Sequence, residues 1–241
     1  MKTINIKEKL EEIDVPVESL VLGDFDFIGK FTAERVRDKS DPNFKKYGAF
    51  YRSNYERGIL IYHLIRQFKL TSFLEIGFGR GYATFCAAKA FHDSGVQGEI
   101  VTVDPNFDEQ LLQALTTVFD PDWFKMVQFM KGPSEQVLPQ VNRNFDLIYI
   151  DGDHSYHGTK LDWELCKEKF DSFLLFDDYH MPDKNDPGIQ CSQLIDEIED
   201  DSKELIVMDR RIFFDDRRFT DDQINYGQVL LTKPTVERDD W

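Results

Sequence analysis

The residues of this chain most suited to chemistry are three aspartates at the ends of two consecutive expected strands. The run Phe145–Ile150 leads to Asp151, and the run Ser172–Phe176 leads to Asp177 and Asp178. Because ligands of open α/β sheets bind beyond the carboxyl ends of the strands, the three acids would converge if these strands are neighbours. Three carboxylates repel one another unless a cation neutralises them. All-oxygen ligation favours Mg²⁺, Mn²⁺ or Ca²⁺ over zinc, so we predict a site for a hard divalent cation.

A histidine follows the first of these acids in the same loop. His154 stands three positions after Asp151. Since histidine titrates near neutral pH, His154 is our candidate for the general base that takes a proton from an acceptor hydroxyl. It could instead only orient an acid, and His157 and His180 are less favoured candidates. The acids also have an ordinary explanation, because a carboxylate often caps the helix that follows a strand.

A glycine-rich turn comes earlier in the chain, within Phe73-Leu74-Glu75-Ile76-Gly77-Phe78-Gly79-Arg80-Gly81. The run before it lacks polar alternation, which is typical of a strand buried on both faces. Residues at helical spacing follow, from Tyr82 to Phe91. Glycine permits positive φ and close approach of a ligand to the backbone. The order of strand, glycine turn and helix predicts a nucleotide-type α/β unit, although a tight turn without a ligand would also use glycines.

The spacing of these glycines indicates which ligand the turn would bind. A dinucleotide fingerprint needs glycines at the first, third and sixth positions, whereas Gly77, Gly79 and Gly81 stand at the first, third and fifth. Glu75 precedes them, and a carboxylate would repel a phosphate but attract an ammonium or sulfonium group. The pattern Glu-x-Gly-x-Gly-x-Gly over residues 75–81 resembles motif I of class I S-adenosylmethionine-dependent methyltransferases.

Further positions are expected to line the same cofactor site. The second expected strand, 99–104, ends in Asp104, whose carboxylate could accept both hydrogen bonds of a ribose diol. Alternatively, Asp104 caps a helix that begins near Asp108. In methyltransferases of the class that this chain resembles, the loop after the third strand abuts the adenine. That resemblance makes Gly132 and Ser134 candidates by position.

Taken together, the motifs resemble those of one family. Asp-Gly-Asp-His-Ser-Tyr over 151–156 and Asp-Asp-Tyr over 177–179 resemble the macrocin-type, metal-dependent O-methyltransferases, which are relatives of catechol O-methyltransferase. The similarity in order and spacing extends over about 53–233. The resemblance implies that S-adenosylmethionine is held by Glu75, Gly77, Gly79, Gly81 and Asp104, that Mg²⁺ is held by Asp151, Asp177 and Asp178, and that His154 is the base. We add Gly132, Ser134 and Asp151 to the predicted cofactor site. Catechol O-methyltransferase itself has an asparagine where this chain has Asp178, so a catechol acceptor is not implied.

Composition limits the classes of partner. The chain has 241 residues, 41% of them hydrophobic, and a formal net charge of −16. This size suffices for a domain with a core of its own, and the charge would repel a nucleic acid. The cysteines Cys86, Cys166 and Cys191 lack metal-binding spacing, so we interpret them as reduced core thiols of a cytoplasmic protein. No apolar run approaches membrane length and no signal peptide is recognisable, so no membrane partner is expected.

The order of expected elements predicts an α/β, Rossmann-like, doubly wound sheet of seven strands, mostly parallel with an antiparallel final strand. The strands are expected at 73–76, 99–104, 126–130, 145–151, 172–176, 205–208 and 228–232. Residues 53–241 would form the S-adenosylmethionine-binding methyltransferase domain. Residues 1–52, with a helix over Lys7–Ile13, would be an N-terminal extension or cap that covers the site, makes a homo-oligomer contact or simply packs on the core. The loops 181–188 and 209–226 would complete the acceptor pocket.

We therefore expect a Mg²⁺-dependent O-methyltransferase that acts on a hydroxyl of a small-molecule acceptor. An NAD(P)-dependent oxidoreductase would also need a glycine turn and an acid after the second strand, but the glycine spacing and Glu75 disfavour it. A non-catalytic binding or assembly module on the same fold is disfavoured by the intact set of acids. Related sequences with the Asp-Gly-Asp-His motif also include sugar or antibiotic tailoring enzymes of other reaction types, and the sequence leaves this alternative open.

Overall fold

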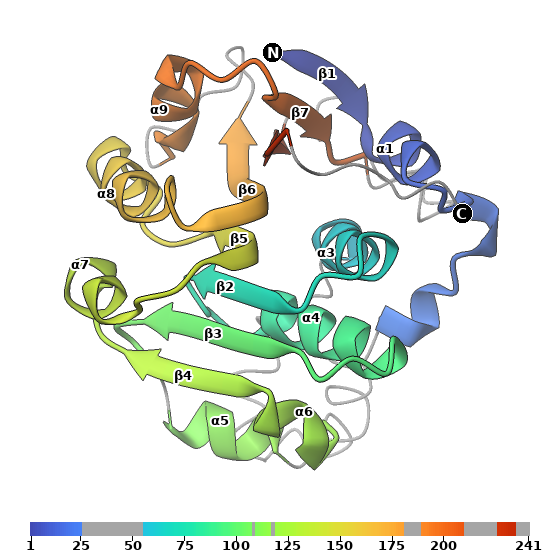
Figure 1. The fold of residues 1–241 in the computed structure, drawn as a ribbon, viewed down its shortest axis with the longest axis vertical. Helices are drawn as coiled ribbons and strands as arrows, with labels where there is room; N and C mark the ends of the chain where they lie inside the picture. The colour runs from blue at the N-terminus through green and yellow to red at the C-terminus, as the bar shows by residue number, and fades with distance from the viewer. Residues whose placement is uncertain (26–54, 108, 117–118, 181–188, 210–225, 235–241) are drawn as a thin grey trace, which may run out of the picture.

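A mixed sheet of eight strands runs through the molecule in the computed structural model (Figure 1), which describes residues 1–25, 55–107, 109–116, 119–180, 189–209 and 226–234. The strands are β1 (Lys2–Asn5), β2 (Ser72–Ile76), β3 (Glu99–Asp104), β4 (Val127–Lys131), β5 (Phe145–Ile150), β6 (Phe170–His180), β7 (Glu204–Val207) and β8 (Tyr226–Thr232). Their order in the sheet is β1-β7-β8-β6-β5-β2-β3-β4. Among these described strands, β8 runs antiparallel to its neighbours β6 and β7, and the other pairs are parallel.

Helices cover both faces of this sheet, as the sequence predicts. One layer holds α1 (Ile6–Glu12), α3 (Tyr55–Gln67) and α4 (Tyr82–Asp93), with α5 (Glu109–Leu115) and α6 (Pro121–Lys125) beside β4. The other layer holds α7 (Ser134–Val137), α8 (Tyr156–Cys166) and α9 (Cys191–Glu197). Phe73 and Leu74, successive residues of β2, belong to the two opposite core clusters because side chains alternate along a strand. The doubly wound α/β fold is therefore confirmed.

The sheet has one strand more than the seven we expected, and the additional strand comes from the N-terminal segment. β1 pairs in parallel with β7, from Lys2 opposite Glu204 to Asn5 opposite Val207. The sequence analysis missed it because β1 is a four-residue edge strand with exposed or half-buried side chains. The predicted helix that follows is confirmed as α1, whose Lys9 makes a 2.6 Å ion pair with Glu204. Residues 2–5 thus extend the main sheet, while the predicted cap falls largely on residues outside the described ranges.

Three further findings concern the predicted cysteines, membrane segments and pocket loops. All three cysteines are buried free thiols, as predicted. Within the described ranges, none of the helices combines the length and apolar character needed to cross a bilayer. The loops expected to complete the acceptor pocket, 181–188 and most of 209–226, lie outside the described residues.

The sheet order brings the chemical motifs to one edge. β2 lies between β3 and β5, and β5 pairs in parallel with β6, as the prediction of converging acids requires. The carboxyl ends of these four strands therefore meet at the same edge of the sheet, which is where open α/β sheets bind ligands.

Candidate active site

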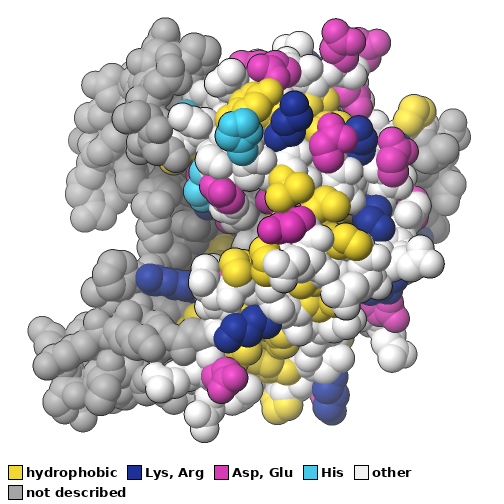
Figure 2. Space-filling model, turned by 90° about the vertical axis from the view of Figure 1, so that its left-hand side faces the viewer, with side chains coloured by type: hydrophobic (Ala, Val, Ile, Leu, Met, Phe, Trp, Pro, Cys, Tyr) yellow, Lys and Arg dark blue, Asp and Glu magenta, His cyan; other side chains and the backbone are white. Residues whose placement is uncertain are grey.

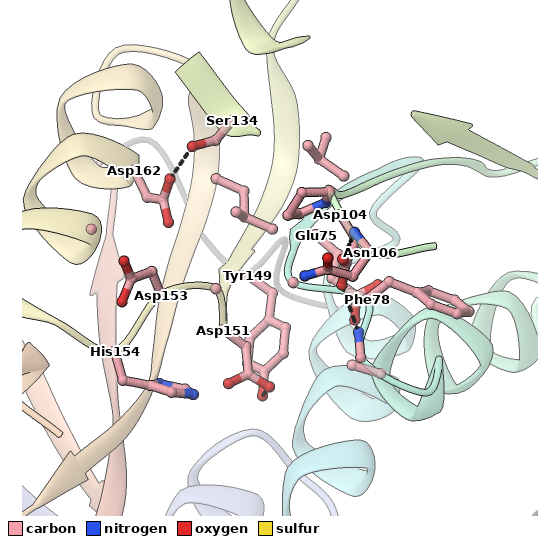
Figure 3. A pocket seen from close by; sticks show the side chains of 18 of the residues that line it. Glu75, Phe78, Asp104, Asn106, Ser134, Tyr149, Asp151, Asp153, His154 and Asp162 are labelled. Carbon is pink, nitrogen blue, oxygen red and sulfur yellow. Dashed lines mark hydrogen bonds between the residues drawn. The ribbon is translucent and has the colours of Figure 1, made fainter. Parts of the chain in front are cut away.

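A cavity of about 800 Å³ opens at this edge, between the glycine turn and the loops that follow β3, β4 and β5 (Figure 3). The predicted site residues that line it are Glu75, Gly77, Gly79, Asp104, Ser134, Asp151, His154 and Asp178. Gly81, Gly132 and Asp177 are not part of its lining, and neither are the alternative histidines His157 and His180. The structure thus brings most of the predicted residues to one cavity, and His154 is the histidine of the three that lines it.

The glycine turn is shaped by its backbone. Gly77, Gly79 and Gly81 all have positive φ, of 91°, 51° and 83°. A Cβ at Gly77 would lie 2.0 Å from the carbonyl oxygen of Asp151, so the turn is pressed against the end of β5. A Cβ at Gly79 would meet no described atom within 4 Å. Gly77 is therefore required by close approach, whereas Gly79 leaves open space beside the backbone for a ligand.

Glu75 is held by hydroxyl groups inside the protein. Its side chain is buried, and one carboxylate oxygen accepts hydrogen bonds from Thr84 and, at 2.7 Å, from Thr102. Burial raises the pKa of Glu75 to about 8. The group is mostly neutral at pH 7, so its attraction for a sulfonium is weaker than that of an exposed carboxylate. Its role as a cofactor ligand stays a prediction.

Asp104 connects the end of β3 to the glycine turn. Its Oδ2 accepts a hydrogen bond from the backbone N–H of Gly79 at 3.1 Å, and its Oδ1 accepts one from Asn106 at 2.6 Å. The alternative prediction was that Asp104 caps the following helix. Neither hydrogen bond goes to that helix, because both donors lie in turns at the cavity. Its carboxylate lies beside Asn106 at the cavity wall (Figure 3).

On the opposite wall, Ser134 meets an acid that the sequence analysis overlooked. The Ser134 hydroxyl donates a 2.5 Å hydrogen bond to Asp162 of α8 (Figure 3). Asp162 is only 3% exposed, and this burial raises its pKa to about 6. Its helical spacing with the buried Thr159 and Cys166 was the available signal, because a polar residue in a buried stripe needs a partner.

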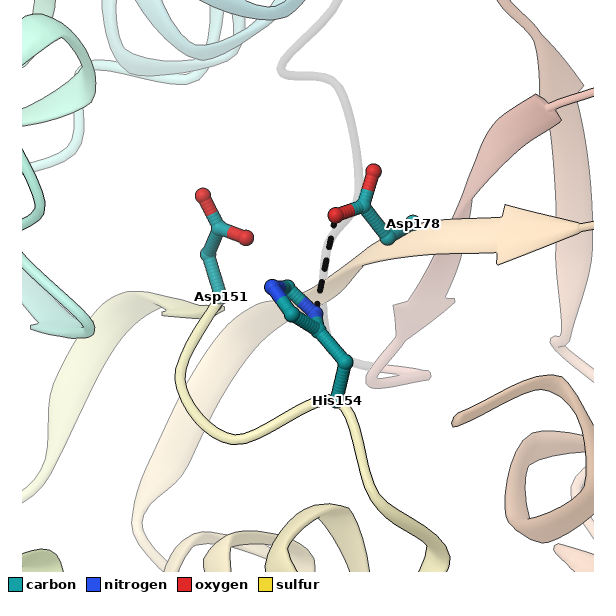
Figure 4. A group of neighbouring side chains, drawn as sticks. All are labelled: Asp151, His154 and Asp178. Carbon is teal, nitrogen blue, oxygen red and sulfur yellow. Dashed lines mark ion pairs between the residues drawn. The ribbon is translucent and has the colours of Figure 1, made fainter. Parts of the chain in front are cut away.

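Three side chains at the cavity form a group that could hold a metal ion (Figure 4). One potential ligand atom from each of Asp151, His154 and Asp178 lies within 4.8 Å of the others. Nδ1 of His154 is 3.5 Å from Oδ2 of Asp178. Burial, followed by the charge of Asp177, raises the pKa of Asp151 well above its usual range. A bound cation would offset this penalty, and the two carboxylates offer the oxygen ligands that Mg²⁺ and Mn²⁺ prefer.

Asp177, predicted as a third metal ligand, is not in this group. Its side chain is buried, and its Oδ2 accepts a 2.6 Å hydrogen bond from the Tyr149 hydroxyl. Its Oδ1 is 3.3 Å from Nε2 of Gln228. Nη1 of Arg57 completes an ion pair with Asp177 at 2.6 Å. The carboxylate is therefore engaged by donors of the protein itself.

Arg57 is the main residue that the sequence analysis missed. It extends from α3, and besides Asp177 it contacts Asp178 at 2.7 Å through Nη2, while Nη1 lies 3.9 Å from Asp151. The cation that three converging carboxylates require is thus supplied in part by a guanidinium. The signal was its spacing, because Arg57 shares a helical stripe with the buried Ile61 and Leu64.

Comparison with known proteins identifies the fold and the domain. Residues 74–179 match the family model described as methyltransferase domain. Among solved structures, the chain resembles the O-methyltransferase TomG from Streptomyces achromogenes in complex with SAM (TM-score 0.55, 14% identity, 86% of this chain and 89% of that chain). It also resembles an O-methyltransferase from Bacillus cereus in complex with SAH (TM-score 0.55, 17% identity, 85% and 91%). A third similar structure is the SAH-bound methyltransferase PaMTH1 from Podospora anserina (TM-score 0.50, 22% identity, 86% and 87%).

At these identities the structures establish the fold, and the family model establishes the type of domain. No curated protein sequence matches the chain. The family match, the strand–glycine turn–helix unit and the sheet order agree with one another. Over residues 74–179 the chain therefore contains a methyltransferase domain, and its fold is the one seen in these solved methyltransferases.

Proposed function

We propose that this methyltransferase transfers the methyl group of S-adenosylmethionine to a hydroxyl of a small molecule, with a divalent cation, Mg²⁺ or alternatively Mn²⁺ or Ca²⁺. The observation that carries the proposal is the group of Asp151, His154 and Asp178, which lies on the same cavity as the glycine turn. A base and a cation site beside a methyl donor are what transfer to a weakly acidic hydroxyl requires.

The cofactor would lie between the glycine turn and α7. The open backbone at Gly79 and the carboxylate of Asp104 would receive its amino-acid and ribose parts, and the adenine would lie toward Ser134 on the far wall of the cavity. Glu75 would support the turn through Thr84 and Thr102. Gly81 would act indirectly as the residue that starts α4, and Gly132 as the bend before Ser134.

In this proposal Asp151 and Asp178 hold the cation, and Asp177 holds Arg57 beside them. A bound divalent cation would lower the pKa of the acceptor hydroxyl. The His154 side chain is 37% exposed and lines the cavity, and its Nδ1 points to Asp178. The ring would take the proton of the acceptor hydroxyl. The oxygen would then bond to the methyl carbon of S-adenosylmethionine while the carbon–sulfur bond breaks, and the electron pair of that bond would stay on sulfur to give S-adenosylhomocysteine.

The proposed partners follow from charge and burial. Lys and Arg side chains on the face formed by α7, α8 and α9 are scattered among acidic ones rather than gathered into a basic area (Figure 2). Together with the net charge of −16, this supports a small-molecule acceptor over a nucleic acid. The three buried thiols support a reducing location such as the cytoplasm. A homo-oligomer stays a prediction.

Titration calorimetry and a methyl-transfer assay test this function. We expect S-adenosylmethionine and S-adenosylhomocysteine to bind and NAD not to bind, and turnover of a panel of hydroxylated acceptors to stop with a chelator and return with Mg²⁺ or Mn²⁺. Asp151→Asn and Asp178→Asn should weaken Mn²⁺ binding, whereas Asp153→Asn, in the same loop but outside the metal group, should not. Full turnover in excess chelator would show that the acids serve another purpose.

A further inference from the structure

Arg57 is a largely buried arginine on the apolar face of α3. Its side chain is 13% exposed on a stripe of α3 that otherwise carries fully buried aliphatic residues such as Ile61 and Leu64. Burial of a guanidinium is unfavourable unless it is paired and hydrogen-bonded. The two terminal nitrogens of Arg57 contact two different carboxylates, Asp177 at 2.6 Å and Asp178 at 2.7 Å.

An irregularity in β6 makes this double contact feasible. Successive residues of a strand normally point to opposite faces, so Asp177 and Asp178 should not share a partner. The register between β6 and β8 shifts between Phe176 and Tyr179, and Asp178 has a φ of +51°. Such a break in the ladder re-aims a side chain. Here it brings both carboxylates within reach of the same guanidinium.

The unusual backbone at Asp178 persists only if its surroundings hold it. Cys191 donates through Sγ to the Asp178 carbonyl oxygen at 2.9 Å, which holds the main chain. Arg57 takes Oδ1 of the side chain, and this leaves Oδ2 on the side of His154. The two oxygens of Asp178 thus have different tasks, one toward the arginine and one toward the metal group.

The formal charge of this cluster also suits a divalent cation. The carboxylates of Asp151, Asp177 and Asp178 together with the guanidinium of Arg57 leave a formal charge of minus two. A divalent cation would neutralise that remainder. Side chains that orient ligands from behind are commonly needed for metal affinity, and their loss usually weakens binding by about 10–100-fold.

We propose that Arg57 is the positioning residue of the cation site: its guanidinium, anchored on Asp177, orients Asp178 so that Oδ2 faces Asp151 and His154. This inference rests on the proposed function, since it assigns a residue to the cation site of that function. It assigns Asp177 the task of anchoring the arginine. Because the two terminal nitrogens of the planar guanidinium bridge Asp177 and Asp178, a positive charge alone at position 57 is not sufficient to orient Asp178.

The experiment measures Mn²⁺ affinity by electron paramagnetic resonance, without cofactor or acceptor. We expect Arg57→Gln to weaken Mn²⁺ binding by about 10–100-fold. Arg57→Lys retains the charge but not the fork, and we expect it to weaken binding too. Millimolar guanidinium should restore affinity to Arg57→Ala. The matched control is Arg66→Gln on the same helix, because Arg66 contacts the Tyr62 hydroxyl and does not line the cavity.

Each outcome decides the inference. Wild-type affinity in Arg57→Lys would show that charge suffices, and tighter binding in Arg57→Gln would show that the arginine competes with the ion, so either result overturns positioning. Melting curves and S-adenosylhomocysteine titrations identify a variant that fails to fold, in which case Arg57→Lys, the milder change, decides. If the wild type itself binds no Mn²⁺, the cation site of the proposed function fails, and the inference fails with it.

Discussion

The two halves of the cavity are built by different means. The glycine turn after β2 is backbone, fixed by three positive φ angles and by the contact of Gly77 with the end of the neighbouring strand. The other half, the proposed cation site, is built from side chains. They come from the loop after β5, from β6, and from α3, whose Arg57 precedes Asp178 by 121 positions. We expect the glycine turn to be disrupted by substitutions that add volume. We expect the cation site to be disrupted by substitutions that change the charge or orientation of a side chain, and the predictions below test this difference.

The largest expected effect is on the side-chain half. If His154 is the base, His154→Ala should lower kcat by about 10²–10⁴-fold, because a positioned proton acceptor contributes that much. The affinity for S-adenosylmethionine should hardly change, since the imidazole belongs to the acceptor side. The loss should shrink as pH rises, because an acceptor that is already ionised needs no base. Steady-state kinetics across pH check this, and a ratio of wild-type to variant turnover near one at every pH would make His154 a structural turn residue.

The next effect breaks the backbone half. Gly77→Ala places a Cβ 2.0 Å from the Asp151 carbonyl oxygen at a φ of 91°, so strain and overlap should lower the free energy of unfolding by about 3 kcal/mol or more. Gly79→Ala adds the same methyl group where no described atom is within 4 Å, and should cost only about 1–2 kcal/mol. Denaturant unfolding compares the two. Equal losses would contradict the close approach at Gly77.

Asp104 sharpens the comparison, because it is a side chain that serves the backbone half. Asp104→Ala removes the acceptor at Gly79 and the expected bonds to the ribose, which should weaken S-adenosylmethionine binding by roughly 1.5–3 kcal/mol. Asp104→Asn retains an acceptor and should lose less. Calorimetric titration gives both values, and unchanged affinity in the alanine variant would remove Asp104 from the site.

The last expected effect is a dependence of stability on pH at Glu75. Its pKa is raised from 4.5 to about 8 in the folded protein, so between these values the unfolded chain loses a proton that the folded protein keeps. The free energy of unfolding should therefore decrease as pH rises through this window. Scanning calorimetry should find that the melting temperature falls less from about pH 5 to about pH 8 in Glu75→Gln than in the wild type. Parallel curves for the two proteins would mean that Glu75 does not titrate differently on folding.

The backbone half was predictable from the sequence and the side-chain half only partly, for a physical reason. The residues 73–91 encode strand, turn and helix through local rules of periodicity and of glycine conformation, and the structure follows them as β2 and α4. The convergence of Asp151 with Asp178 followed from the rule that parallel strands end at one edge. The orientation of Asp177 away from this group depends on Arg57 and on a break in strand alternation, which no local pattern contains.

Burial on α8 illustrates the same limit. On this helix Leu161 is 38% exposed, whereas the neighbouring Asp162 is buried. Asp162 accepts a hydrogen bond from Ser134 at the cavity, and no local pattern contains that partner, because it comes from another segment of the chain.

The pairing of β1 with β7 has a consequence for how the chain folds. Lys9 and Glu204, which pair beside these strands, are 195 positions apart, so this edge closes one of the longest loops in the molecule. Ordering a loop of that length costs entropy before any contact repays it, and such contacts form late. Residues 2–5 are synthesised before 204–207, so β1 cannot pair until the segment that contains its partner strand has been made. In hydrogen-exchange labelling during refolding, the amides of β1 and β7 should therefore gain protection together and after those of β2 and β5.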